Sequence, residues 1–319
     1  MDNIDQLFLD LFKDKKPVNL YEPISYILTQ GGKRLRPKLV GIASEMFNGD
    51  PEGTKHIAAA FEMLHNFTLI HDDIMDKANV RRGKLTIYKK WNTNIAILSG
   101  DALAVMAMQQ LYNLQCRPET IIEISKVFTQ TALEICEGQQ YDLDFETAEE
   151  VLIEDYLDMI RLKTAVMFAG CLKSGAIFAG ADCNSIQALY DLGIHLGMAF
   201  QLADDLLDVY ADTEVFGKAV GGDIKDNKKT FVFLKALELG NDEQKNELKR
   251  LFSTSNCDEK EKFEAVKTIF DALDVKQATE NSIEKYTKLC FEDLKKVNTE
   301  ESKKSFLTDL VVKLQNREK

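Results

Sequence analysis

The chain has 319 residues, of which 45% are hydrophobic, so it can bury a large core as one big domain or as two ordinary ones. Forty basic residues against 52 acidic ones give a net charge of −12, which argues against a nucleic-acid partner. Six scattered cysteines without metal-like spacing indicate free thiols in a reducing compartment. The acidic N-terminus does not have the order of a signal peptide, and the longest apolar passage is too short to span a membrane. We therefore expect a soluble cytoplasmic protein without stable membrane insertion.

Apolar residues recur at intervals of three and four along the whole chain, and runs typical of strands are almost absent. This pattern predicts an all-α fold, a large helical bundle formed as a single domain over residues 1–319. Thr147 and Glu150 have the spacing of a capping box, which predicts a helix start there. We expect helices over about 37–47, 50–76, 93–113, 118–144, 147–171, 185–208 and 230–239, and three or four charged helices beyond Gly240.

Two copies of the same acidic pattern end two largely apolar helical runs. Asp72 and Asp76 are four residues apart with Asp73 beside them, and Asp204, Asp205 and Asp208 repeat this spacing. Carboxylates at this spacing project from one helix face and suit Mg²⁺, which prefers hard oxygen ligands. A single copy is more often a solvated acidic face, but the second copy favours a polynuclear metal site.

Residues 31–38, Gly-Gly-Lys-Arg-Leu-Arg-Pro-Lys, place four cations at a predicted helix N-terminus. Basic clusters are usually solvated turns. Here the free N–H groups of the helix end, the glycines and the arginines together predict a diphosphate pocket. Arg81 and Arg82 form a second source of phosphate contacts.

Other polar residues lie close to these motifs. Lys163-Thr164 lies in a predicted helix, where a lone lysine is more often a surface residue. Lys218 and Lys228 lie in a glycine- and lysine-rich loop after the second acidic motif. Glu62 and His65 have the ExxH spacing of di-iron bundles, but the four histidines of the chain provide no second such pair, so the di-iron interpretation is weak.

Taken together, the motifs resemble those of the trans-prenyl diphosphate synthases, and they occur in the order of that family. The resemblance covers about residues 20–240, and the charged C-terminal helices over 241–319 match it only in length and character. The motifs that carry it are Gly-Gly-Lys-Arg-Leu-Arg-Pro (31–37), His-Asp-Asp-Ile-Met-Asp (71–76) with Arg-Arg-Gly (81–83), Gly138-Gln139, Lys163-Thr164, Phe-Gln-Leu-Ala-Asp-Asp-Leu-Leu-Asp (200–208) and Gly217-Lys218 with Gly-Gly-Asp (221–223).

The resemblance implies an isoprenoid-synthase type of helical bundle around an apolar cavity. It also implies a Mg²⁺-dependent, head-to-tail prenyltransferase that adds isopentenyl diphosphate to an allylic diphosphate such as dimethylallyl, geranyl or farnesyl diphosphate. Such enzymes are usually homodimers, and three Mg²⁺ ions hold the allylic diphosphate. By carry-over, the metal ligands are Asp72, Asp76 and Asp204, supported by Asp73, Asp205 and Asp208. The allylic diphosphate would be bound by Arg81, Lys163, Lys218 and Lys228. The diphosphate of isopentenyl diphosphate would be bound by Lys33, Arg36, His65 and Arg82. The reacting carbons would be flanked by Thr164 and Gln201.

Product length in this family depends on bulk at the fourth and fifth positions before the first acidic motif. These positions are Thr68 and Phe67 here, which resembles short-chain synthases and favours a C20 product, with C15 as the alternative. The alternative is that Phe67 is a core aromatic between helices, which is the commoner role of a phenylalanine on an apolar helix face. The carry-over leaves Glu62 without a role.

Two rival functions share some of these features. A class I terpene cyclase has the fold and the first acidic motif, but it normally lacks the Gly-Gly-Lys-Arg cluster and a second complete acidic motif. A non-catalytic subunit of a heteromeric prenyl synthase tends to lose acidic-motif residues, and all six aspartates are present here.

Overall fold

The computed structural model describes residues 4–211, 220–253 and 258–315, and these are almost entirely helical. Contacts between residues divide the chain into two compact units. Unit 1 comprises Met1–Ala132, Gly170–Tyr190 and Asn298–Lys303; unit 2 comprises Leu133–Ala169, Asp191–Val297 and Lys304–Lys319. The all-α prediction is confirmed, whereas the single-domain assignment stays a prediction.

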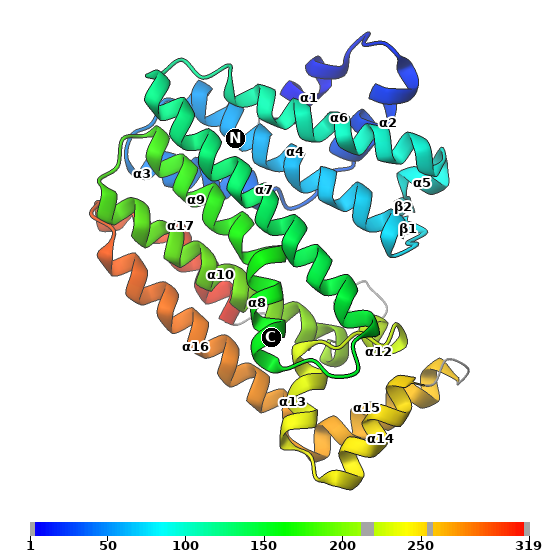
Figure 1. Cartoon of the computed structure of the whole chain (residues 1–319). Helices are drawn as coiled ribbons and strands as arrows, with labels where there is room; N and C mark the ends of the chain where they lie inside the picture. The colour runs from blue at the N-terminus through cyan, green and yellow to red at the C-terminus, as the bar shows by residue number, and fades with distance from the viewer. Residues whose placement is uncertain (1–3, 212–219, 254–257, 316–319) are drawn as a thin grey trace. The chain divides into compact units, whose positions relative to one another are not determined.

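Unit 1 is built on the long helix α4 (Figure 1). Its N-terminus has the predicted start, because the Asp50 carboxylate accepts a hydrogen bond from the Gly53 N–H at 2.8 Å and Pro51 occupies the first turn. α6 runs along α4, and α3 packs on it as well. The elements that begin in this unit are α1 (Ile4–Phe12), α2 (Val18–Leu28), α3 (Leu35–Met46), α4 (Pro51–Met75), β1 (Val80–Arg81), β2 (Lys84–Leu85), α5 (Ile87–Lys90), α6 (Thr93–Leu111), α7 (Pro118–Thr147) and α10 (Cys183–Tyr210).

The core of unit 1 is apolar and closely packed. Phe61 is fully buried on α4 and meets the Phe128 ring of α7 edge-to-face, with 5.4 Å between the ring centroids. Burying one side chain of this kind contributes about 1.5–3 kcal/mol. The strands β1 and β2 form a two-residue antiparallel hairpin in which Val80 pairs with Leu85. The Tyr26 hydroxyl donates to the Leu85 carbonyl at 2.9 Å and ties this hairpin to α2.

The remaining elements, apart from α17, begin in unit 2, where α13 packs against α8 and α16. α7, α9, α10 and α17 each contribute residues to both units. The capping box predicted at Thr147 is wrong, since Thr147 ends α7 and its hydroxyl donates back to the Asp144 carbonyl. The elements are α8 (Ile153–Ile160), the π-helical turn η1 (Arg161–Ala165), α9 (Val166–Phe178), α12 (Gly222–Lys225), α13 (Phe231–Leu239), α14 (Asp242–Ser253), α15 (Glu259–Ala272), α16 (Val275–Lys296) and α17 (Glu301–Gln315).

Among the described residues, no helix combines the length and the apolar character needed to cross a bilayer.

Candidate active-site residues

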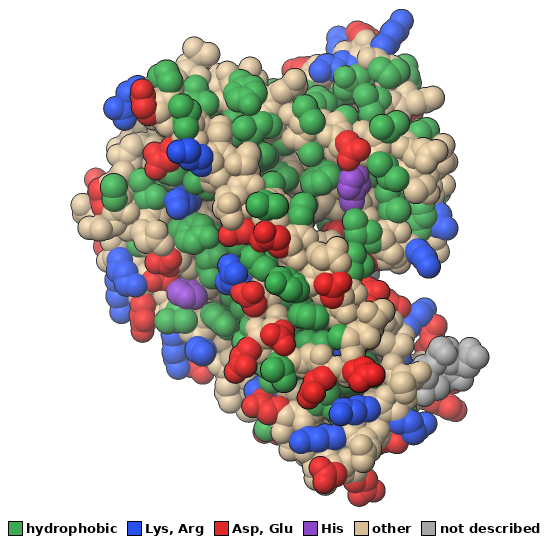
Figure 2. Space-filling model, viewed as in Figure 1, with side chains coloured by type: hydrophobic (Ala, Val, Ile, Leu, Met, Phe, Trp, Pro, Cys, Tyr) green, Lys and Arg blue, Asp and Glu red, His purple; other side chains and the backbone are tan. Residues whose placement is uncertain are grey.

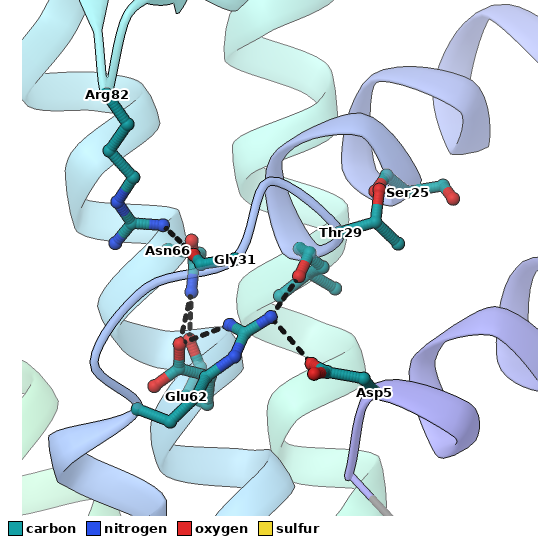
Figure 3. Close-up of polar contacts among 9 residues, drawn as sticks. Asp5, Ser25, Thr29, Gly31, Glu62, Asn66 and Arg82 are labelled. Carbon is teal, nitrogen blue, oxygen red and sulfur yellow. Dashed lines mark hydrogen bonds and ion pairs between the residues drawn. The ribbon is translucent and has the colours of Figure 1, made fainter.

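The glycine-rich loop before α3 lies against the hairpin that carries Arg82 (Figure 3). An Arg82 Nη1 atom donates to the Gly31 carbonyl at 2.8 Å, although the two residues are 51 positions apart. Gly31 and Gly32 have φ angles of 80° and 140°, which favour glycine. A Cβ atom on Gly32 would also lie 3.4 Å from the Arg82 guanidinium carbon. The loop geometry thus brings the two basic motifs of the sequence together.

Arg34 has a structural role within this loop. Its Nη1 atom lies 2.6 Å from a Glu62 oxygen and its Nη2 atom lies 2.8 Å from an Asp5 oxygen; Nη2 also donates to the Leu28 carbonyl (Figure 3). The side chains of Arg34 and Glu62 are only 11% and 4% exposed. Glu62, which had no role by carry-over, is therefore the buried counter-ion of Arg34, and Asn66 also donates to it. This pairing leaves no support for the di-iron interpretation.

His65 lies one turn further along α4, within the electrostatic reach of the predicted basic cluster. Burial lowers its pKa well below the usual value, and the positive charges of Arg36, Arg82, Arg81 and Arg34 lower it further. His65 is therefore neutral at pH 7, and the surrounding guanidinium groups provide the positive charge. The structure thus brings Arg36, His65 and Arg82 into one electropositive cluster, while Lys33 is exposed in the loop before α3.

The first acidic motif forms the last turn of α4. Asp76 is the C-cap residue, and its N–H donates to the Asp72 carbonyl at 2.8 Å, so the two residues lie one turn apart as predicted. Asp73 is only 3% exposed and accepts from the Arg81 Nε atom at 2.8 Å. Burial raises the pKa of Asp73, whereas the Arg81 charge and hydrogen bond lower it. Asp73 and Arg81 thus form one ion pair between the helix end and the hairpin.

The two residues assigned to product length lie on the preceding turn of α4. The Phe67 ring contacts the His71 ring edge-to-face at a centroid distance of 4.8 Å, and the Thr68 hydroxyl donates to the His65 carbonyl. His71 in turn fits against Gly100 of α6, where a Cβ atom would lie 2.3 Å from the His71 Nε2 atom. Phe67 is partly exposed rather than buried in the core.

In unit 2, Lys163 and Thr164 lie in the π-helical turn η1 rather than in regular helix. Such turns occur frequently at functional sites. A Cβ atom on Gly138 of α7 would lie 2.3 Å from the Lys163 backbone nitrogen, and one on Gly197 of α10 would lie 2.4 Å from the Ala165 Cα atom. Only glycine permits both close approaches, which explains the glycine of the Gly138-Gln139 motif.

A pocket of about 110 Å³ lies beside this turn. Lys163 pairs there with the Asp142 carboxylate of α7. The Lys229 ammonium donates to the Phe145 and Glu146 carbonyls at the end of α7, and burial lowers its pKa. The pocket is lined by Asp142, Phe145, Glu146, Tyr156, Met159, Ile160, Lys163, Thr164, Gln201, Asp205, Asp223, Lys228, Lys229 and Thr230. It therefore holds Lys163, Thr164, Gln201, Asp205 and Lys228 of the predicted set.

The second acidic motif lies in the last two turns of α10, which ends at Tyr210. Asp205 is buried and accepts from Gln201, from Tyr156 and from the Phe231 backbone N–H. Burial raises its pKa to about 7, although these three hydrogen bonds act in the opposite direction. Asp204 is partly exposed on the same turn.

Asp208 holds the backbone of Gly221 and Asp223, just before and within α12. The Asp223 N–H donates to its carboxylate at 2.9 Å, and the Gly221 N–H donates to its backbone carbonyl. Burial and the nearby Asp208 and Asp205 carboxylates raise the pKa of Asp223 to about 8. Lys218, predicted to bind diphosphate, lies outside the described residues.

Sequence reasoning missed Asp142, Tyr156 and Lys229, and it did not foresee the contacts that Arg34 and Asp223 make. Asp142 follows Gly138-Gln139 by one turn, and Tyr156 precedes Lys163 by two turns, so helical periodicity from the assigned residues could have suggested both. The burial of Arg34 and its pairing with Glu62 have no local signal.

An arrangement of guanidinium groups, ammonium groups and carboxylates around a helical scaffold is typical of a protein that binds diphosphates with a divalent cation. The Polyprenyl synthetase family model matches residues 17–269. The chain is 41% identical over 283 residues to the geranylgeranyl diphosphate synthase of Sulfolobus acidocaldarius, covering 88% of this chain and 85% of that protein. It is 37% identical over 244 residues to the geranylfarnesyl diphosphate synthase of Natronomonas pharaonis, covering 72% of each.

Solved structures agree with this likeness. A crystal structure of a geranylgeranyl pyrophosphate synthase superposes with a TM-score of 0.92 at 42% identity, covering 100% of this chain and 99% of that one. The geranylgeranyl pyrophosphate synthetase of Pyrococcus horikoshii superposes with a TM-score of 0.94 at 33% identity, covering 99% and 96%. The chain therefore belongs to the polyprenyl synthetase family and is a trans-prenyltransferase.

Proposed function

We propose that the protein condenses isopentenyl diphosphate with an allylic diphosphate and releases a short-chain prenyl diphosphate, with C20 favoured over C15. The observation that carries the proposal is the electropositive cluster around His65, which lies on the same helix as Asp72 and Asp76. Desolvated guanidinium groups bind diphosphate strongly because both partners are charged and the geometry allows paired hydrogen bonds. Two of the curated relatives that match it are geranylgeranyl and geranylfarnesyl synthases, which supports the short-chain assignment.

The two diphosphates would bind to different basic groups. Isopentenyl diphosphate would take the cluster in unit 1, where Arg36, His65 and Arg82 come together and Lys33 lies on the adjoining loop. The allylic diphosphate would take Arg81, Lys163, Lys218 and Lys228, and the pairing of Lys163 with Asp142 holds this ammonium in the pocket until a phosphate binds.

The acidic motifs suit Mg²⁺ by their chemistry. Asp72 and Asp76 offer two carboxylates on one helical turn, and Asp204 offers another on a partly exposed face of α10. Within the described ranges no three His, Cys, Asp or Glu side chains already form a metal cluster. Mg²⁺ commonly uses one or two carboxylates and completes its shell with water and substrate phosphates, so the chemistry of these side chains fits this ion. We assign three Mg²⁺ ions to Asp72, Asp76 and Asp204; when bound, they neutralise the charge that develops on the departing pyrophosphate.

The protein's own groups would bind, orient and exclude water. The Thr164 hydroxyl donates to the Gln201 side-chain oxygen at 3.0 Å, which gives both groups one orientation beside the reacting carbons. Lys163 and Arg81 would stabilise the negative charge that forms as the allylic C–O bond breaks. The allylic cation is then attacked by the double bond of isopentenyl diphosphate, and the departing pyrophosphate takes the final proton. No protein nucleophile is required.

We assign the floor of the product cavity to Phe67, with Thr68 as its small neighbour. The partly exposed Phe67 ring and its contact with His71 support this assignment. Phe67→Ala is expected to lengthen the products while turnover stays within a few fold. An unchanged product distribution, measured by mass spectrometry, would leave Phe67 as a packing residue.

A second copy of this chain is the proposed partner. Leu98, Val105 and Tyr112 are spaced by seven residues along α6 and its end, and they are 60%, 63% and 63% exposed. Apolar side chains are also frequent on the part of the surface over α6, whereas charged side chains dominate over α13 and α14 (Figure 2). A stripe with this spacing is typical of helix pairing.

We also propose a cytoplasmic location, because Cys116, Cys136, Cys171, Cys183 and Cys290 are all free thiols.

Turnover by the purified protein tests the function directly. The protein would be incubated with isopentenyl diphosphate and dimethylallyl, geranyl or farnesyl diphosphate, with Mg²⁺ or with a chelator. We expect Mg²⁺-dependent consumption of isopentenyl diphosphate and a C20 diphosphate as the main product. Release of a hydrocarbon without isopentenyl diphosphate would indicate a terpene cyclase. No turnover by the isolated chain would indicate a non-catalytic subunit.

A further inference from the structure

Tyr156 of α8 is a buried tyrosine whose hydroxyl faces α10, the helix that carries the second acidic motif. It is only 4% exposed, and its hydroxyl donates to the Asp205 Oδ2 atom at 2.5 Å, 49 positions away in sequence. A buried tyrosine hydroxyl usually has a partner, but a carboxylate at this short distance makes a charge-assisted bond of the stronger kind.

The two carboxylate oxygens of Asp205 accept hydrogen bonds from three donors. Oδ2 accepts from Tyr156 and, at 3.3 Å, from the Phe231 backbone N–H, while Oδ1 accepts from the Gln201 Nε2 atom at 3.0 Å. These contacts direct the carboxylate into the protein. They also link α10 to α8 and to the first residue of α13.

The contact between Asp205 and Gln201 determines the orientation of the Gln201 amide. The Gln201 Nε2 atom donates to the Asp205 Oδ1 atom, so the amide oxygen faces the other way. That oxygen accepts from the Thr164 hydroxyl at 3.0 Å. A continuous chain of hydrogen bonds therefore runs from Tyr156 through Asp205 and Gln201 to Thr164.

We propose that Tyr156 is a positioning residue for the reaction: by fixing Asp205, it sets the orientation of Gln201 and Thr164 beside the reacting carbons. This inference rests on the proposed function, since it takes Gln201 and Thr164 as groups of the prenyl-transfer site. It assigns Tyr156 an effect on the chemical step and on the allylic substrate rather than on the binding of isopentenyl diphosphate, whose cluster lies in unit 1.

Tyr156→Phe removes the hydroxyl and keeps the ring that packs in the core. We expect kcat to fall about tenfold or more, while the KM for isopentenyl diphosphate changes less than twofold. Tyr286→Phe is the control, because Tyr286 is another tyrosine of unit 2, partly buried on α16 beside His195. Its kcat should stay within twofold of the unsubstituted protein. Circular dichroism and thermal unfolding of both variants give the folded fraction at the assay temperature.

Double variants distinguish a positioning role of Tyr156 from a general loss of packing around it. If Tyr156 acts along the chain of hydrogen bonds, Tyr156→Phe with Thr164→Val should be little slower than the slower single variant. Combined with Arg36→Ala, which belongs to the other substrate, the effects on kcat/KM should multiply. Full multiplication of the Tyr156 and Thr164 effects, or a kcat within twofold in folded Tyr156→Phe, would overturn the inference.

The failure of the inference can be told apart from failure of the proposed function. If Asp204→Ala abolishes turnover but Tyr156→Phe does not lower kcat, only the positioning role is wrong. If Asp204→Ala leaves turnover intact, the proposed site itself is wrong.

Discussion

The two acidic motifs have the same spacing but are neutralised in different ways. Asp73 of the first motif is buried against a cation, the Arg81 guanidinium, whose side chain is 31% exposed. Asp205 of the second motif is buried against neutral donors, namely Tyr156, Gln201 and a backbone N–H. Both residues lie near the end of their helix, but Asp73 meets the hairpin, whereas Asp205 meets α8 and the first residue of α13. One sequence pattern thus serves two electrostatic designs.

The two units differ in which cations already pair with a carboxylate of the protein. In unit 1, Arg34 and Arg81 are engaged by Glu62 and Asp73, so two of the cations that the sequence offers also hold the fold together. In unit 2, neutral groups hold Asp205, while Lys163 pairs with Asp142 in the pocket. Substitutions in the ion pairs of unit 1 should therefore affect mainly the free energy of unfolding, and substitutions in the pocket of unit 2 should affect mainly turnover.

The largest expected effect is on turnover and is shared by both motifs. Asp72→Ala and Asp204→Ala should each lower kcat by on the order of 10²–10³, because each would remove an oxygen ligand from the proposed metal site, which stabilises the leaving group. Steady-state kinetics of folded variants at saturating Mg²⁺ measure this effect. Asp309→Ala, an exposed acid on α17, is the control. Near-normal kcat in either motif variant would remove that aspartate from the metal site.

The buried ion pair of unit 1 should dominate stability. Glu62→Gln leaves the Arg34 charge without its buried counter-ion and should lower the free energy of unfolding by about 3 kcal/mol. Arg250→Gln, which breaks an exposed pair with Glu247 one turn away, should lower the free energy of unfolding far less, because water screens this pair. Urea denaturation measures both. Equal losses would mean that burial does not distinguish the two pairs.

Loss of one cation should raise the KM of one substrate and leave the KM of the other nearly unchanged. Arg36→Ala should raise the KM for isopentenyl diphosphate about tenfold and leave that for the allylic substrate nearly unchanged, since one charged contact is lost at one site. Lys163→Ala should show the opposite bias. Initial rates with each substrate varied in turn measure this; equal shifts for both substrates in both variants would contradict the assignment.

The smallest effect is the opposite pH dependence of stability in the two regions. The pKa of His65 is lowered on folding, so only the unfolded chain binds this proton below about pH 6.5, and stability falls as the pH decreases. The pKa of Asp205 is raised to about 7, so the folded chain retains a proton between about pH 4 and 7, and stability falls as the pH rises.

Single variants separate these two slopes in the metal-free protein. Relative to the unsubstituted protein, His65→Gln should gain stability at pH 5.5 compared with pH 7, and Asp205→Asn should gain stability at pH 7 compared with pH 5.5. Each slope is at most that of one proton, about 1.4 kcal/mol per pH unit. Urea titrations at several pH values measure it, and slopes of the same sign in both variants would contradict the comparison.

The sequence by itself determined the helical class, the start of α4 at Asp50-Pro51 and the residues expected at the site. Helical periodicity, caps and motif spacing are local properties, so they can be read without knowing which helices pack together. Local spacing was not enough at Thr147, whose hydroxyl bonds backward along α7 while the next helix begins at Ile153.

Only the tertiary structure decided which polar groups meet. Arg34 reaches Glu62 across 28 positions and Tyr156 reaches Asp205 across 49, and no local pattern connects such partners. It also determined why Gly138 is glycine, because the backbone of the π-helical turn lies too close for a side chain. Buried charges need partners, and the partners come from whichever elements the core brings together.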